Sequence, residues 1–216
     1  MIITKLALIC TLFLTLFFGN LSYGEKIDQQ LIAQAKSGDI DAQYELALAY
    51  ENGDEQFSQD SRKALFWMTQ AANAGLADAQ RDLGYYYDAG ELVEQDFQKA
   101  FKYYQLAVKQ NHAAAQNNLA TLYFNGEGVQ QSDLNALKYY RLAAAQGNHL
   151  ANFNLAEMYE DGSGVNQNYK IASQYYEAAI NNCDYDAEDA LANLYETGGY
   201  GLKKDLAKAK LYRSRE

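Results

Sequence analysis

The sequence has no proline and only two cysteines, Cys10 and Cys183, in 216 residues. Without proline, long segments can form uninterrupted helices, because proline removes a backbone donor and breaks helix interiors. Two cysteines cannot build the disulfide framework of a small secreted domain, so the fold must be stabilised by packing. Basic residues are also scarce, since 18 Lys and Arg against 28 Asp and Glu give a net charge of −10. This balance argues against nucleic acid or an anionic membrane surface as the main partner, because both attract basic faces.

The first 24 residues have the pattern of an export signal. A single charge at Lys5 precedes an apolar run from Leu6 to Phe18, and the small residues Ser22 and Gly24 are suited to cleavage after Gly24. The run is short for a membrane span, which needs about 20 apolar residues. We therefore expect a signal peptide at 1–24 and a periplasmic or secreted chain. An uncleaved anchor is the alternative, because no further charge follows within the segment.

The remainder of the chain repeats itself every 36 or 37 residues. The pattern Ala-x-x-x-Leu-small-x-x-Tyr occurs five times, with its leucines at Leu46, Leu83, Leu119, Leu155 and Leu191. Residues four apart share one face of a helix, so each pattern predicts an amphipathic helix. A second helical pattern follows each first one and carries an aromatic residue: Trp67, Tyr103, Tyr139, Tyr175 and Tyr212. We expect these rings and the pattern tyrosines to pack in the core.

Glycine-bearing turns separate the two helical patterns of each unit, which predicts helical hairpins. One hairpin cannot bury its apolar face alone, so neighbouring hairpins must stack. The expected fold class is all-α, a right-handed α/α superhelical solenoid of five hairpins. We expect an N-terminal capping helix at 25–37 and a solenoid at 38–216, with repeats at about 38–74, 75–110, 111–146, 147–182 and 183–216.

The combined motif resembles the Sel-one-like repeat (SLR) family, a relative of the tetratricopeptide repeat. The third unit carries it as Ala115-Gln116, Leu119-Ala120, Tyr123, Gly126-Glu127-Gly128-Val129, Ala136 and Tyr139-Tyr140. The resemblance covers roughly residues 38–213. It implies a bacterial exported scaffold or regulator that binds a protein or peptide, such as an envelope enzyme, the periplasmic domain of a sensor kinase or a host protein.

The tetratricopeptide resemblance also implies a concave groove lined by the first helix of each pair. The lining positions lie two before and two, five and six after each pattern leucine. These positions include Tyr44, Leu48, Glu51, Arg81, Tyr85, Asp88, Asn117, Thr121, Phe124, Asn125, Phe153, Glu157, Glu160, Asp189, Asn193 and Glu196. Amides can hold a peptide backbone, rings offer apolar contact, and carboxylates attract Lys or Arg. The alternative is that these are only solvated helix positions.

We assign no catalytic, cofactor-binding or metal-binding residue from the sequence. It has no phosphate-binding loop, nucleophile elbow or Ser/His or Cys/His signature. His112 and His149 lie 37 residues apart, but no further ligand recurs beside them. The turn 161–164 lacks the alternating acids of a calcium loop, and no His or Lys flanks Cys183 to activate its thiol.

An enzyme remains an alternative function on the resemblance alone. Some cysteine-rich exported SLR proteins are described as penicillin-binding or β-lactamase-like. Those proteins carry a disulfide in each repeat, whereas this chain has no such cysteines. We therefore do not expect an enzyme.

Charge is unevenly distributed along the chain. Residues 25–202 hold 11 basic and 26 acidic side chains, whereas 203–216 hold six basic and two acidic. The simplest interpretation is a polar cap that closes a repeat array and keeps it soluble. The alternative is a contact for an acidic partner or for the acidic groove of a second copy, which would give a weak homo-oligomer.

Overall fold

The computed structural model describes residues 29–53, 57–180 and 185–214. Within these ranges the chain is helical and has no β-strand, apart from an isolated antiparallel bridge between Gly199 and Leu202. The predicted all-α class is therefore confirmed. The expected signal peptide at 1–24 and Cys183 lie outside the described residues. No helix in the described part of the chain is both long and apolar enough to cross a membrane.

The chain divides after Leu83 into two compact units, each described here by itself. The first unit holds a helix at residues 29–37 and then α2 (Ile40–Asn52), α3 (Ser61–Ala74) and the start of α4 (Ala77–Ala89). The helix at 29–37 lies within the segment that the sequence assigns to a capping helix, and its Ala35 packs in one cluster with Leu46.

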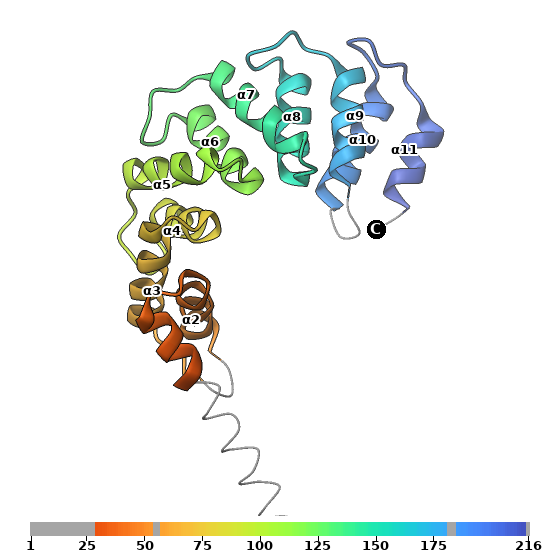
Figure 1. Cartoon of the computed structure of the whole chain (residues 1–216). Coiled ribbons are helices and arrows are strands. Elements are labelled where there is room, and N and C mark those ends of the chain that lie inside the picture. Colours follow the sequence, from red (N-terminus) through yellow and green to blue (C-terminus); the bar gives the residue numbers. More distant parts are fainter. Residues whose placement is uncertain (1–28, 54–56, 181–184, 215–216) are drawn as a thin grey trace, which may run out of the picture. The chain divides into compact units, whose positions relative to one another are not determined.

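The second unit continues from the end of α4 as a series of antiparallel helices (Figure 1). Each helix packs against the one before it and the one after it. The helices are α5 (Phe97–Lys109), α6 (Ala113–Asn125), α7 (Asp133–Ala144), α8 (His149–Asp161), α9 (Tyr169–Ala179), α10 (Tyr185–Thr197) and α11 (Leu206–Arg213).

The five pattern leucines form the centre of the core. Their exposed fractions are 0% at Leu46, Leu119, Leu155 and Leu191 and 1% at Leu83. The small residue that follows each leucine is also buried, and at Gly84 an added Cβ would lie 2.6 Å from the ring of Tyr104. Leucines therefore fill the layer between helices, while small residues allow the helices to approach closely. The prediction that the five pattern leucines are core residues is confirmed.

The same two hydrogen bonds close the turn inside each of the first four hairpins. The backbone N–H of the residue that caps the second helix donates to the carbonyl of the pattern tyrosine, as in Asp96 to Tyr87 at 2.8 Å and Asn168 to Tyr159 at 2.7 Å. The glutamine just before that cap donates from Nε2 to a carbonyl at the end of the first helix. The glutamine bonds are Gln59 to Glu51, Gln95 to Asp88, Gln131 to Phe124 and Gln167 to Glu160.

The aromatic residues pack in two layers rather than one. The pattern tyrosines stack on the predicted second-helix rings, with centroid separations of 5.9 Å for Tyr87–Tyr103 and 5.8 Å for Tyr123–Tyr139. These second-helix rings are only half-buried. The next residue in the chain is the deeper one, since Tyr104, Tyr140 and Tyr176 are 0%, 3% and 2% exposed. The doubled tyrosines therefore place one ring on the hairpin surface and one in its interior.

His112 has a structural role in this arrangement. It is the N-cap of α6, and its Nδ1 accepts a hydrogen bond from the backbone N–H of Ala115 at 3.2 Å. Asn148 caps α8 in the same way, through a bond from Ala151 at 2.8 Å. The position before α6 thus needs a side-chain acceptor for an otherwise unpaired backbone donor.

Candidate functional site

A hollow of about 200 Å³ lies between α6 and α8, with α7 behind it. Four of the predicted groove residues meet there, namely Thr121, Phe124, Asn125 and Glu157. Three further lining residues were not among the predicted positions: Tyr140, Asn154 and Met158. The hollow therefore brings together first-helix positions from two successive repeats and the buried tyrosine of the hairpin between them.

Hydrogen bonds fix the polar walls of this hollow. The Tyr140 hydroxyl lies 3.0 Å from Thr121 Oγ1, which also donates to the carbonyl of Asn117 at 3.2 Å. Asn154 Nδ2 donates to Asn117 Oδ1 at 3.0 Å and so links α8 to α6. Burial raises the pKa of Tyr140 to about 12, so its hydroxyl is protonated at neutral pH. A bound guest would meet walls that are already ordered.

Acidic side chains gather at the α8 side of the hollow. Partial burial raises the pKa of Glu157, and the nearby charges of Asp161 and Glu160 raise it further. Burial likewise raises the pKa of Glu160, although the bond that it accepts from the Tyr176 hydroxyl at 2.8 Å opposes that rise. Within the described residues, Glu157 has no hydrogen bond or ion pair. Among the described residues, this rim of the hollow carries negative charge and Glu157 has no basic partner.

In the α10–α11 hairpin, the buried tyrosine of the earlier hairpins is replaced by an arginine. Arg213 of α11 stands at the register of Tyr104, Tyr140 and Tyr176 in the earlier hairpins. Its Nη2 donates to Asn193 Oδ1 at 2.6 Å and to Glu196 Oε2 at 2.9 Å, and its Nη1 lies 3.6 Å from Asp189 Oδ1. The three predicted groove residues of this repeat are thus brought together around one guanidinium.

The remaining predicted residues of the second unit lie at the ends of first helices or on their faces. Asp88 accepts a hydrogen bond from the Tyr104 hydroxyl at 2.9 Å, and burial raises its pKa. Tyr85 is exposed and donates to Glu91 Oε1 at 3.0 Å, a bond that raises the tyrosine's pKa. Phe153 packs edge-on against Tyr176, with 5.4 Å between ring centroids. Phe153 therefore packs against the core of its hairpin.

In the first unit, Tyr44 and Arg81 converge on Asp82, a residue that the offset rule does not select. The Tyr44 hydroxyl donates to Asp82 Oδ2 at 2.7 Å, and Arg81 forms an ion pair with the same carboxylate. Burial, followed by the bond to Asp82, raises the pKa of Tyr44. Glu51 and Leu48 are half-buried at the end of α2. Tyr44 and Arg81 are therefore paired within their own unit.

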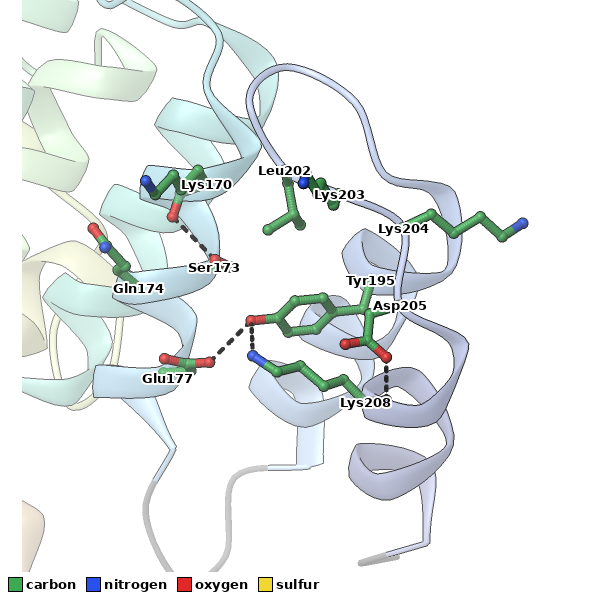
Figure 2. A pocket seen from close by; sticks show the side chains of 10 residues that line it. All are labelled: Lys170, Ser173, Gln174, Glu177, Tyr195, Leu202, Lys203, Lys204, Asp205 and Lys208. Atoms are coloured by element: carbon green, nitrogen blue, oxygen red, sulfur yellow. Dashed lines mark hydrogen bonds between the residues drawn. The ribbon is translucent and has the colours of Figure 1, made fainter.

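A second, larger hollow of about 460 Å³ lies beside α9 and the loop that precedes α11 (Figure 2). Lys170, Lys203, Lys204 and Lys208 are among its lining residues. Lys208 Nζ bonds to the Tyr195 hydroxyl at 2.9 Å, and that hydroxyl donates to Glu177 at 3.2 Å. Figure 2 shows the side chains of Lys170 and Lys204 pointing in opposite directions, away from each other. The lysines do not converge on one point, so this hollow is not shaped for a single multivalent anion.

No cluster of three or more His, Cys, Asp or Glu that could hold a metal ion occurs among the described residues. The hollow between α6 and α8 offers hydroxyl, amide and carboxylate groups on an apolar base. Its hydroxyls are bonded to each other rather than to a base that could activate them. The arrangement is suited to recognition by hydrogen bonding and charge.

Comparison with known proteins identifies the repeat. The family model of the Sel1 repeat matches the chain five times, at residues 40–76, 77–112, 113–148, 149–182 and 186–212. A sel1-like repeat-containing protein of Acanthamoeba polyphaga mimivirus is 43% identical over 65 residues, which are 30% of this chain and 12% of that protein. The chain thus spans only a small part of this curated relative.

Solved structures extend the likeness over most of the chain. A protective antigen present in uropathogenic Escherichia coli strains, which displays an SLR fold, aligns with a TM-score of 0.81 and 30% identity. The alignment covers 87% of this chain and 40% of that one. A Sel1 repeat protein from Oxalobacter formigenes aligns with a TM-score of 0.78 and 26% identity over 88% of this chain and 76% of its own. The expected solenoid of SLR hairpins is therefore confirmed.

Proposed function

Because the chain belongs to the Sel1 repeat family, whose members generally mediate protein–protein interactions, we propose that it is a scaffold that binds a partner on its first-helix face. The observation that carries the proposal is the hollow between α6 and α8. Its pre-ordered walls combine amides, an apolar base and an unpaired carboxylate, which are the groups that hold a peptide. Binding there would cost little ordering of the host.

We propose further that the protein is exported and meets its partner in the periplasm or outside the cell. The pattern of residues 1–24 supports export, and bacterial Sel1 repeat proteins are often exported. The Escherichia coli relative is a protective antigen, which agrees with such a location. The partner would then be an envelope enzyme, a sensor-kinase periplasmic domain or a host protein.

Binding rather than catalysis is the activity that we propose. The Sel1 repeat fold is typically non-enzymatic, and the hydroxyls of Thr121 and Tyr140 are hydrogen-bonded to each other rather than to a carboxylate or a histidine. A nitrocefin hydrolysis assay on the purified chain tests the β-lactamase-like alternative. Turnover that disappears on replacement of one polar residue of the hollow would overturn the proposal.

The direct test is capture of a partner in the native envelope. Crosslinking of the full chain, followed by mass spectrometry, should identify a protein that is lost when Asn125→Trp fills the hollow. Asn125 is an exposed rim position, so the change should leave the core intact. Gln98→Trp, at an exposed position on α5, is the matched control and should retain the partner. Equal capture by both variants would refute a role for this hollow, and membrane fractionation of the same samples reports the compartment.

A further inference from the structure

We infer that the hollow between α6 and α8 binds the guanidinium of an arginine side chain on the partner. This inference rests on the proposed function and names the chemistry that the groove selects. Phe124, Tyr140 and Met158 supply the apolar part of the lining of the hollow. An arginine carries an apolar stem and a flat charged head, so it can pack on such a lining while its nitrogens reach polar groups at the rim.

The chain already contains one arginine whose guanidinium is bound by first-helix side chains. Arg213 places its guanidinium against Asp189, Asn193 and Glu196, which occupy the first-helix positions two before, two after and five after Leu191. The contact uses two carboxylates and one amide oxygen. These groove positions can therefore supply the acceptors that a guanidinium requires, with donor–acceptor distances of 2.6 and 2.9 Å for its two hydrogen bonds.

The corresponding positions near α8 have acceptors but no arginine of their own. Glu157 lies two after Leu155 and Glu160 lies five after it, as Asn193 and Glu196 do relative to Leu191. The interior register position holds Tyr176, whose hydroxyl satisfies only one oxygen of Glu160. In the part of the chain that the structure describes, Glu157 has no partner. The negative rim is therefore available to a cation of the partner.

The size of the hollow fits one side chain. Its volume of about 200 Å³ is below the range of about 300–1,000 Å³ that is common for small-molecule sites. The amides of Asn125 on α6 and Asn154 on α8 also line the hollow and add hydrogen-bonding groups to Glu157. A carboxylate with neighbouring amides distinguishes a planar, multiply donating guanidinium from an apolar side chain.

The test uses a library of random linear peptides displayed on phage and selected on the full chain. Enriched peptides should share an arginine. In the synthetic peptide, replacement of that arginine by citrulline, its neutral near-isostere, should weaken binding at least about tenfold, because a hydrogen-bonded charge pair is lost. Glu157→Gln should cause a similar loss with the arginine peptide and little further loss with the citrulline peptide, because the two changes remove the same interaction. Glu45→Gln, at an exposed position on α2, is the charge-matched control and should bind as the unmodified chain does.

The outcomes separate the two proposals. Peptides that Asn125→Trp abolishes but that bind equally with citrulline would overturn the arginine assignment and leave the groove function standing. Peptides that bind Asn125→Trp as tightly as the unmodified chain would overturn both the groove function and the arginine assignment. A library that yields no binder would do the same. Equal affinity of Glu157→Gln and the unmodified chain for the arginine peptide would also overturn the assignment.

Discussion

The hairpin α8–α9 and the final hairpin α10–α11 use the same register position in different ways. The interior hairpin has Tyr176, which is buried and donates one hydrogen bond to Glu160. The final hairpin has Arg213, whose side chain is 43% exposed and holds two carboxylates and an amide. A phenol supports a groove carboxylate without neutralising it, whereas a guanidinium neutralises it. Glu160 thus lies beside a neutral phenol, whereas the guanidinium of Arg213 offsets part of the negative charge of Asp189 and Glu196.

The largest expected effect on stability comes from truncating a core leucine of the α8–α9 hairpin. Leu155→Ala should lower the free energy of unfolding by about 2–5 kcal/mol, because it leaves a cavity at a fully buried position. Urea denaturation followed by circular dichroism measures the loss. Leu134→Ala, at a leucine that is 71% exposed, is the control and should change stability by less than about 0.5 kcal/mol. An unchanged midpoint for Leu155→Ala would contradict the packing described for α8.

Removing the phenol hydroxyl of the interior hairpin should have the next largest effect. Tyr176→Phe should cost about 1–2 kcal/mol, because Glu160 loses a buried donor. The pKa of Glu160 should rise further, since that bond opposes the rise caused by burial. The same urea experiment at neutral pH, together with a carboxyl titration by NMR, measures both changes. A Glu160 pKa that does not move would show that the bond is not formed in solution.

Replacing Arg213 by the tyrosine of the earlier hairpins should have a smaller effect on stability. Arg213→Tyr should reduce stability by no more than about 1 kcal/mol, because its ion pairs with Asp189 and Glu196 are substantially exposed. The difference from the unmodified chain should shrink in high salt, which screens such pairs. Thermal unfolding at low and high ionic strength checks this expectation. A loss that does not depend on salt would mean that Arg213 acts through packing instead.

The smallest effect concerns the pH dependence of the negative rim. The pKa of Glu157 is raised in the folded chain, so the folded state binds its proton more readily than the unfolded state does. The ionised carboxylate therefore costs stability above its folded pKa, and this cost disappears as the pH falls below the unfolded value. Glu157→Gln should stabilise the chain at pH 7 by on the order of a few tenths of a kcal/mol and have no such effect near pH 3. A destabilised variant at pH 7 would reveal a favourable partner of Glu157 within the chain.

The repeat register could be read from the sequence because it depends on local periodicity. The spacing of Leu46 through Leu191 predicts five buried positions, and all five are buried. The deeper ring of each tyrosine pair was not predicted, because Tyr103 and Tyr104 differ only in the direction in which each points from the helix. The doubled tyrosines were the available signal, since the same pair recurs at Tyr139-Tyr140 and Tyr175-Tyr176.

The groove residues were accessible to sequence reasoning only in part. Offsets from the pattern leucine select Thr121, Phe124 and Glu157, which do line the hollow. They miss Asn154 and Met158, because the width of the space between α6 and α8 decides which further positions face it. The role of Arg213 also depends on register in the second helices, where it follows Tyr212 as Tyr176 follows Tyr175. Whether these residues contact a partner stays a prediction.

The turn hydrogen bonds have a consequence for how such a chain can change in length. Four hairpins carry the same glutamine-to-carbonyl bond, and each is made between residues of a single hairpin. Duplication or deletion of a whole hairpin would thus add or remove its own turn hydrogen bond. No donor or acceptor of this bond would be left unpaired in another hairpin. Evolution or an engineer could lengthen the array by whole hairpins inserted between α9 and α10, and thereby multiply the negative sites that precede Arg213.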